Sequence, residues 1–145
     1  MKYALKEALS IHKDAIYNIK KSSVFSYVDN IWGWDEEFQL NDFERDFSNI
    51  EQFSVIEMNE KICGFVQIYD HDDTIELVEI HLIPEMQGNG IGSDIIKKLL
   101  ERAKNENKSV RLGCFKENIR AKKLYQKLGF VQTGETGTHF VFEWQ

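Results

Sequence analysis

Three glycines stand directly before an apolar helical pattern near the middle of the chain, in the stretch PEMQGNGIGSDII at residues 84–96. They are Gly88, Gly90 and Gly92. Glycine lets a backbone approach a ligand more closely than a residue with a Cβ, and the first turn of a helix leaves unpaired N–H groups that attract anions. The stretch therefore predicts a loop that binds an anion through main-chain amides.

Two common phosphate-binding loops do not fit this spacing. A dinucleotide fingerprint needs G-x-G-x-x-G and an acidic residue about 20 positions further on, whereas these glycines alternate with single residues. A nucleoside triphosphate loop ends in Gly-Lys-Ser/Thr, but Gly92 is followed by Ser93 and Asp94. What remains is a diphosphate held mainly by backbone amides and the helix dipole.

Composition bounds the class of protein. The chain has 145 residues, 42% apolar and 29% charged, with one proline, so we predict a single domain over residues 1–145. No window approaches the roughly 18 apolar residues of a membrane span, and the N-terminal segment lacks a secretory pattern, which predicts a cytoplasmic protein and no membrane partner. The net charge of −6 argues against nucleic acid as a partner. Cys63 and Cys114 lie in apolar runs, so we expect buried thiols and no metal site.

Hydrophobic periodicity predicts an α/β fold with the element order β-α-α-β-β-β-α-β-α-β-β, in which about six or seven strands form a mixed sheet flanked by about four helices. The strands are expected at 2–7, 53–58, 62–70, 75–84, 109–115, 130–134 and 138–144. One or two helices follow the first strand, and another helical pattern runs from WGWDEE to Phe47, with Asn41 and Asp42 as possible caps. A helix begins at Gly90, and a shorter one runs from the N-cap Asn118 to Gly129.

Two blocks of this sequence resemble the GNAT acetyltransferase superfamily. Its pyrophosphate loop, Q/R-x-x-G-x-G/A, is matched by Gln87-Gly88-Asn89-Gly90-Ile91-Gly92, and its helix N-x-x-A-x-x-L-Y-x-x-L-G-F is matched by residues 118–130. The blocks stand in the family's order, separated by one helix and one strand. The WGWDE stretch and the late THF also resemble a subgroup of small bacterial GNAT proteins, in which tyrosine often stands where this chain has Phe140.

The resemblance implies the GNAT fold, acetyl-CoA as cofactor, and transfer of the acetyl group directly to a primary amine of a small molecule or protein. In this family the middle strand offers its free edge to the pantetheine arm, here near Ile80, Leu82 and Ile83. A backbone N–H at or near Ile80 would polarise the acetyl carbonyl. The cofactor-binding residues implied in addition are Gln87, Gly88, Asn89, Gly90, Ile91, Gly92, Ser93, Asn118 and Tyr125.

Acetyl transfer needs a donor for the leaving thiolate and a base for the amine. The family's usual donor matches Tyr125, for which the alternative is a core tyrosine beside Leu124 and Leu128. Glu79 and Glu76 are the candidate bases, and water is the third possibility. Simple alternation along the strand places Glu79 on the opposite face from Glu76.

Four side chains are candidates to contact the acceptor, namely Trp32, Trp34, His81 and His139. The two tryptophans lie beside Asp35 and Glu36, and aromatic faces with acids bind cations. In the competing interpretation the tryptophans pack at a helix end and the acids cap the next helix. The two histidines are either site residues or satisfied packing residues.

Other functions share these features. A CoA-binding sensor or regulatory module would need the glycine loop but neither acid nor base, and an acyltransferase could use another acyl-CoA or an oxygen acceptor. The apolar THFVFEW strand makes a homodimer possible. The acidic segment Asp70–Asp73 is interpreted as a solvated turn, with a metal or substrate role as the alternative. The sequence does not identify the acceptor.

Overall fold

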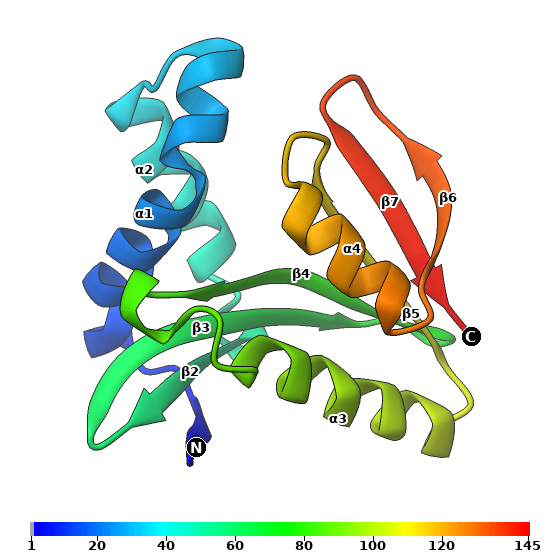
Figure 1. Cartoon of the computed structure of the whole chain (residues 1–145). Helices are drawn as coiled ribbons and strands as arrows, with labels where there is room; N and C mark the ends of the chain where they lie inside the picture. Colours follow the sequence, from blue (N-terminus) through cyan, green and yellow to red (C-terminus); the bar gives the residue numbers. More distant parts are fainter. Residues whose placement is uncertain (1) are drawn as a thin grey trace. The chain divides into compact units, whose positions relative to one another are not determined.

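The computed structural model describes residues 2–145, and these residues form seven strands and four α-helices (Figure 1). The strands are β1 (Ala4–Glu7), β2 (Phe53–Met58), β3 (Lys61–Asp70), β4 (Thr74–Leu82), β5 (Ser109–Phe115), β6 (Val131–Glu135) and β7 (His139–Trp144). The helices are α1 (Lys13–Trp32), α2 (Glu36–Phe47), α3 (Ile91–Asn105) and α4 (Ile119–Lys127). The predicted element order is confirmed.

The strands form one mixed sheet in the order β1-β2-β3-β4-β5-β7-β6. β4 and β5 are parallel, whereas β1 and β2, β2 and β3, β5 and β7, and β6 and β7 pair antiparallel. The parallel pair is possible because α3 supplies the long crossover connection that such a pair requires. The predicted α/β class with a mixed sheet is therefore confirmed.

One predicted helix limit is wrong. α2 runs unbroken from Glu36 to Phe47, so Asn41 and Asp42 are interior helix residues and not caps. The N-cap is Asp35, whose carboxylate accepts a hydrogen bond from the Phe38 amide at 3.1 Å. The buried residues of α2, Phe43 and Phe47, both follow Asn41 and Asp42, while Phe38 in the first half of the helix is exposed.

Five strands have limits that differ by one or two residues from the prediction: β1, β3, β4, β6 and β7. Asn59 and Glu60 make the β2–β3 turn by themselves, with φ angles of 52° and 64°, and Lys61 already belongs to β3. Both angles lie in the left-handed region that tight hairpin turns use. β4 ends at Leu82, because Pro84 starts a short 3₁₀ turn that ends at Met86.

Contacts divide the chain into two compact units. The first unit comprises Met1–Gln67 and Glu79–Ile91, and the second comprises Ile68–Val78 and Gly92–Gln145. β3 and β4 contribute residues to both units. A single domain over residues 1–145 stays a prediction.

The first unit buries an aromatic cluster between its helices and strands. α1 and α2 lie side by side (Figure 1) and share this core with β2 and β3. Its members are Ala8, Ile16, Tyr17, Ile19, Phe43, Phe47, Phe53, Val55 and Phe65. The rings of Phe47 and Phe53 are 5.2 Å apart. Each large apolar side chain contributes about 1.5 to 3 kcal/mol when it is fully buried, so this cluster fixes both helices on the strands.

The second unit buries the apolar face of α3 and one ring from α4. The buried residues of α3 in this unit are Ile95, Ile96, Leu99, Leu100 and Ala103. In α4, Tyr125 packs edge-on against Phe142 of β7 at 5.8 Å. Cys114 is buried in this unit and Cys63 in the first, and both thiols are free, as predicted.

Gly64 lets β3 approach the end of β4 closely. A Cβ built on Gly64 would stand 2.4 Å from the His81 carbonyl oxygen and 2.9 Å from Leu82 Cδ2. The first of these atoms belongs to the backbone, so it cannot move aside cheaply. The neighbouring Cys63 carbonyl accepts a hydrogen bond from the Ile83 amide at 2.9 Å. The backbone position of β4 around His81 therefore depends on this glycine.

We expect Gly64→Ala to lower the free energy of unfolding by about 2 kcal/mol, because an added methyl group in a filled space forces backbone shifts. Urea denaturation measures this change. Gly134→Ala in β6 is the matched control, since a Cβ there meets no atom within 4 Å. Equal stability of the two variants would contradict the close approach.

Candidate active site

The glycine loop joins the 3₁₀ turn after β4 to the start of α3. Gly88 and Gly90 have φ angles of 79° and 82°, in the left-handed region that residues with a Cβ rarely adopt. A Cβ built on Gly90 or Gly92 meets no atom within 4 Å, so these positions face open space. Gln87 Nε2 donates a hydrogen bond to the Leu82 carbonyl at 3.0 Å and ties the loop to the end of β4. The loop is shaped to bring main-chain N–H groups close to an anion.

Glu79 lies on β4 in the first unit, beside two nitrogen-bearing side chains. Its Oε2 is 3.4 Å from Lys20 Nζ of α1 and 3.5 Å from His81 Nε2. The Glu79 side chain is 20% exposed. Burial raises the pKa of Glu79, but His81 and Lys20 lower it by more, so the pKa ends below its usual value. The carboxylate is therefore charged at neutral pH.

His81 carries a buried nitrogen close to Glu79. Its ring lies 5.3 Å from that of Phe65, and its Nε2 lies 3.5 Å from Glu79 Oε2, which is longer than a normal hydrogen bond. Buried polar atoms in native proteins normally have a partner, and Glu79 is the nearest one described for this nitrogen. His81 stays a predicted site residue.

Glu76 lies in the second unit and has partners of its own. Its Oε1 is 3.3 Å from an Arg111 guanidinium nitrogen and 3.1 Å from His71 Nε2. Glu76 and Arg111 stand directly opposite each other on β4 and β5. Opposite charges on facing residues of neighbouring strands stabilise the sheet. This arrangement favours Glu79 over Glu76 as the base.

The helix block places Asn118 and Tyr125 in the second unit. The Asn118 side chain accepts a hydrogen bond from the Ala121 amide at 3.1 Å, so it caps α4 as expected. Tyr125 is 8% exposed and packs against the rings of Phe130 and Phe142. Burial, with a smaller effect of Cys114, raises the pKa of Tyr125 to about 12. The phenol stays protonated and is a hydrogen-bond donor at every physiological pH.

The two tryptophans differ in their surroundings. Trp34 Nε1 donates a hydrogen bond to Glu36 Oε2 at 3.0 Å, and Lys21 Nζ lies 5.5 Å from the centre of the Trp34 ring. Asp35 caps α2, so the geometry at Trp34 fits the capping interpretation better than capture of a cationic acceptor. Trp32 is 61% exposed at the end of α1 and stays a candidate for an acceptor contact.

Glu36 joins α1 to the start of α2. It accepts hydrogen bonds from Lys21 Nζ at 2.8 Å, Trp34 Nε1 at 3.0 Å and the Tyr17 hydroxyl at 2.7 Å. These donors, Lys21 first, lower the pKa of Glu36 to about 2. The cluster fixes the loop between the two helices.

His139 begins β7 in the second unit. Its ring is 4.2 Å from that of Phe115, and its Nδ1 is 2.7 Å from the Thr138 hydroxyl. Burial lowers the pKa of His139, which keeps the imidazole neutral at pH 7. The next residue, Phe140, has the Lys122 ammonium 4.7 Å from its ring centre, so this position offers an aromatic face.

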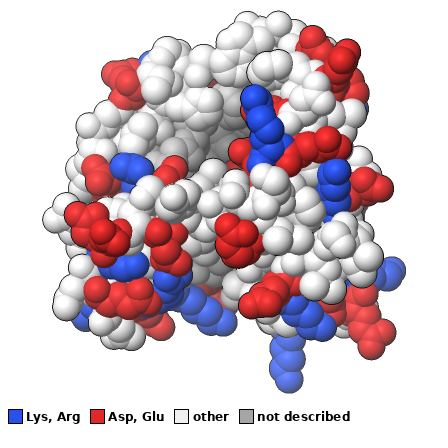
Figure 2. Space-filling view, turned by 180° about the vertical axis from the view of Figure 1, so that it is seen from behind, with Lys and Arg blue, Asp and Glu red and all other residues white. Residues whose placement is uncertain are grey.

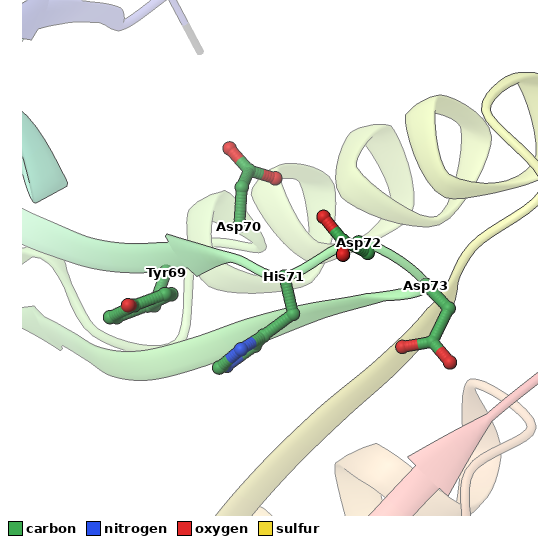
Figure 3. A pocket seen from close by; sticks show the side chains of 5 residues that line it. All are labelled: Tyr69, Asp70, His71, Asp72 and Asp73. Atoms are coloured by element: carbon green, nitrogen blue, oxygen red, sulfur yellow. The ribbon is translucent and has the colours of Figure 1, made fainter.

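The acidic segment between β3 and β4 borders a hollow of about 560 Å³, lined by Tyr69, Asp70, His71, Asp72 and Asp73 (Figure 3). The rings of Tyr69 and His71 stack at 4.4 Å, and Asp70 and Asp72 point away from them. Asp70 pairs with Arg102 of α3. Among residues 2–145, no group of three or more His, Cys, Asp or Glu side chains is placed to hold a metal ion. The arrangement is that of an ion-paired turn.

Charged side chains of both signs are spread over the face shown in Figure 2. On the face shown in Figure 2, Lys and Arg side chains alternate with Asp and Glu and form no continuous basic surface. None of the helices within residues 2–145 has the length and apolar character of a membrane span.

The fold is shared with solved structures of acetyltransferases. The PaiA N-acetyltransferase of Thermoplasma acidophilum, solved in complex with coenzyme A, has a TM-score of 0.78 at 17% identity, over 100% of this chain and 99% of that chain. Ard1 of Thermoplasma volcanium has a TM-score of 0.73 at 18% identity, over 99% of this chain and 97% of that chain. At these identities the likeness shows the fold alone, which is the predicted GNAT fold.

The family is shown by a sequence model. The model of the acetyltransferase (GNAT) family matches residues 13–130, and the chain therefore belongs to this family. The membership predicted from the two sequence blocks is confirmed, and acetyl-CoA, the predicted cofactor, is the acetyl donor that the family uses.

Curated relatives are similar over part of their length. The N-acetylaspartate synthetase of Xenopus tropicalis is 32% identical over 108 residues, which cover 66% of this chain and 40% of that protein. An uncharacterized N-acetyltransferase of Methanocaldococcus jannaschii is 35% identical over 88 residues, which cover 55% of this chain and 39% of that protein. This chain thus matches well under half the length of these two relatives.

Sequence reasoning missed one charged residue next to Glu79. Lys20 stands four residues after Ile16 and four before Val24, both of which are buried on α1. Residues four apart share a helix face, so Lys20 occupies a position where the periodicity expects an apolar residue. The sequence signal that could have revealed Lys20 is a lysine at a position where the helical period predicts a buried apolar residue.

Replacing Glu36 tests the cluster that holds the two helices together. The depressed pKa of Glu36 means that its ionised form stabilises the fold above its ordinary pKa of 4.5, and that this stabilisation is lost as the pH falls toward about 2. We therefore expect Glu36→Gln to lower the melting temperature at pH 7, with the difference from wild type vanishing between pH 4.5 and pH 2. Thermal unfolding followed by circular dichroism measures this.

Glu37→Gln is the matched control, since Glu37 lies in the same first turn of α2. It removes the same charge near the helix N-terminus but none of the three hydrogen bonds to Glu36. Equal losses in the two variants at pH 7 would show that the helix dipole, and not the cluster, is responsible.

Proposed function

We propose that this protein is an acetyl-CoA-dependent N-acetyltransferase that transfers the acetyl group directly to a primary amine of a small molecule or a protein. The observation that carries the proposal is the open glycine loop at the start of α3, in a chain of the GNAT family. Each charge-assisted hydrogen bond from such a loop is worth about 1.5 to 3 kcal/mol. Several amides from Gln87 to Ser93 would then hold the diphosphate of coenzyme A.

The remaining cofactor contacts follow β4. Bound acetyl-CoA would supply an activated thioester, whose C–S bond breaks as the amine nitrogen bonds to the acetyl carbon. The backbone of Ile80, Leu82 and Ile83 is proposed to pair with the pantetheine arm, and an N–H near Ile80 is proposed to stabilise the developing oxyanion. Gly64 and Gln87 support this part of the backbone, the first by close approach and the second by its hydrogen bond to the Leu82 carbonyl.

Glu79 is proposed to accept a proton from the amine, and Tyr125 is proposed to stabilise the leaving thiolate. Glu79 is charged at neutral pH and can accept a proton from the amine as the new bond forms. Tyr125, with a pKa of about 12, donates a hydrogen bond to the departing sulfur. A thiol titrates near 8.5, well below this phenol, so Tyr125 stabilises the thiolate without giving up its proton.

A CoA-binding sensor is the second candidate, and the surroundings of Glu79 argue against it. A sensor needs the loop, but it does not need a shielded carboxylate kept ionised by a histidine and a lysine. Transfer of another acyl group, or transfer to oxygen, would use the same residues. A cytoplasmic location, a homodimer and the absence of a nucleic-acid partner stay predictions.

An amine library tests the function. The protein is incubated with acetyl-CoA and amino acids, polyamines and peptides; free thiol and product mass are then measured, and the hits are repeated with longer acyl-CoAs. L-aspartate is included because a relative is named N-acetylaspartate synthetase. Acetylation of an amine supports the proposal. Tight coenzyme A binding without turnover of any acceptor would favour the sensor, and no binding would contradict both.

The catalytic assignments predict a ranking of variants. Glu79→Gln and Tyr125→Phe should each lower kcat by about 10² to 10⁴ with little change in the affinity for acetyl-CoA. Glu76→Gln is the matched control for Glu79, because Glu76 pairs with Arg111 and His71. This variant should keep kcat within about threefold of wild type. Steady-state kinetics and calorimetry measure these effects. A larger loss in the Glu76 variant would assign the base to Glu76.

A side chain in the open space over the loop should weaken the binding of coenzyme A. Gly92 has an ordinary φ and no atom within 4 Å of its Cβ position, so Gly92→Val keeps the fold while two methyl groups enter that space. We expect calorimetry to show at least about a tenfold weaker affinity for coenzyme A, the loss of about one charge-assisted hydrogen bond. Gly92→Ala is the control, since the family's loop accepts alanine there. Unchanged affinity in Gly92→Val would exclude the loop as the diphosphate site.

A further inference from the structure

Lys20 and Glu79 form an ion pair that is largely shielded from water. Their side chains are 17% and 20% exposed, and 3.4 Å separates Lys20 Nζ from Glu79 Oε2. Two partly buried charges lose much of their hydration, and such a pair does not by itself stabilise a fold. An apolar residue at this position of α1 would pack equally well, so packing alone does not explain why a lysine stands there.

Two nitrogen-bearing side chains approach the Glu79 carboxylate. Lys20 Nζ and His81 Nε2 both lie near Oε2, at 3.4 Å and 3.5 Å. A permanent cation from α1 therefore anchors the carboxylate on β4.

Four elements contribute the groups around Glu79 and His81. α1 contributes Lys20, α2 contributes Asp46, and β4 itself contributes His81, while β3 contributes the uncharged ring of Phe65. Burial is the main cause that raises the pKa of Asp46; Lys20 lowers it, and Asp42 and Glu79 raise it. Lys20 is therefore the one permanent cation in the described residues that offsets burial at Glu79.

We propose that Lys20 is a positioning residue for acetyl transfer: its ammonium group, 3.4 Å from Glu79 Oε2, holds this shielded carboxylate in place and ionised, so that it can accept a proton from the acceptor amine. The proposal rests on the proposed function and goes beyond it by assigning a role to a residue outside the family's sequence blocks. Without Lys20, the buried carboxyl would hold its proton at higher pH and could not accept one from the amine there.

Lys20→Met tests this role, because methionine keeps the length and helix propensity of lysine and removes only the charge. In steady-state assays we expect kcat to fall about threefold at pH 5 and to stay within about twofold of wild type at pH 8.5, since an opposite charge at this range moves the titration of a carboxyl by about 1 to 3 units. Lys20→Arg keeps the charge and should restore the wild-type pH profile.

A second measurement does not depend on turnover. In protein labelled with ¹³C at glutamate carboxyl carbons, with the Glu79 signal assigned from Glu79→Gln, titration by NMR follows Glu79 directly. We expect its midpoint to move to higher pH in Lys20→Met and to stay at the wild-type value in Lys20→Arg. Lys13→Met is the matched control, because Lys13 lies on the same helix, α1, and makes an exposed ion pair with Glu44 of α2 at 2.9 Å. It should change neither the titration nor the pH profile.

The outcomes separate this proposal from the proposed function. Wild-type acetylation combined with an unchanged Glu79 titration in Lys20→Met would overturn the role of Lys20 and leave the activity standing. An equal loss of kcat at every pH, without a shift in the titration, would mark Lys20 as structural and also overturn the proposal. If the wild-type protein acetylates no amine, the proposed function fails, and this role of Lys20 fails with it.

Discussion

The function proposed for this chain depends on unpaired N–H groups at the start of α3. A helix leaves its first amides without an internal partner, and positions 90 and 92 have open space where a side chain would stand. The positive φ angles of Gly88 and Gly90 turn the chain into this shape. Because the binding groups belong to the main chain, the loop needs neither lysine nor arginine, and the rest of the fold serves to hold it at the end of β4.

A second constraint is the balance between burial and charge at Glu79. Burial alone favours a protonated carboxyl, while a charged Lys20 and the neighbouring His81 favour the carboxylate. The same strand carries Glu76, whose partners Arg111 and His71 belong to the second unit. Two glutamates three residues apart thus have different surroundings, one in a cross-strand pair and one in a shielded cluster, and the second is the one proposed to take part in proton transfer.

Much of the fold followed from local signals. β5 was predicted with its observed limits, and Asn118 was predicted as the cap of α4, because strand alternation and capping depend on residues close together in sequence. The limits of α2 were wrong, since Asn41 and Asp42 resemble caps while Asp35 is the residue that caps the helix. Glu36 in the first turn also bonds to Tyr17 and Lys21 of α1, a contact between distant residues that the local pattern does not show.

The sequence alone determined the loop, the element order and the family, because glycine spacing, hydrophobic period and motif order are properties of neighbouring residues. Only the tertiary structure decided which side chains surround each candidate. It placed Lys20 and His81 beside Glu79 and tied Trp34 to Glu36. These contacts bring together residues far apart in the chain, and burial and pKa depend on such neighbours, so no local pattern encodes them.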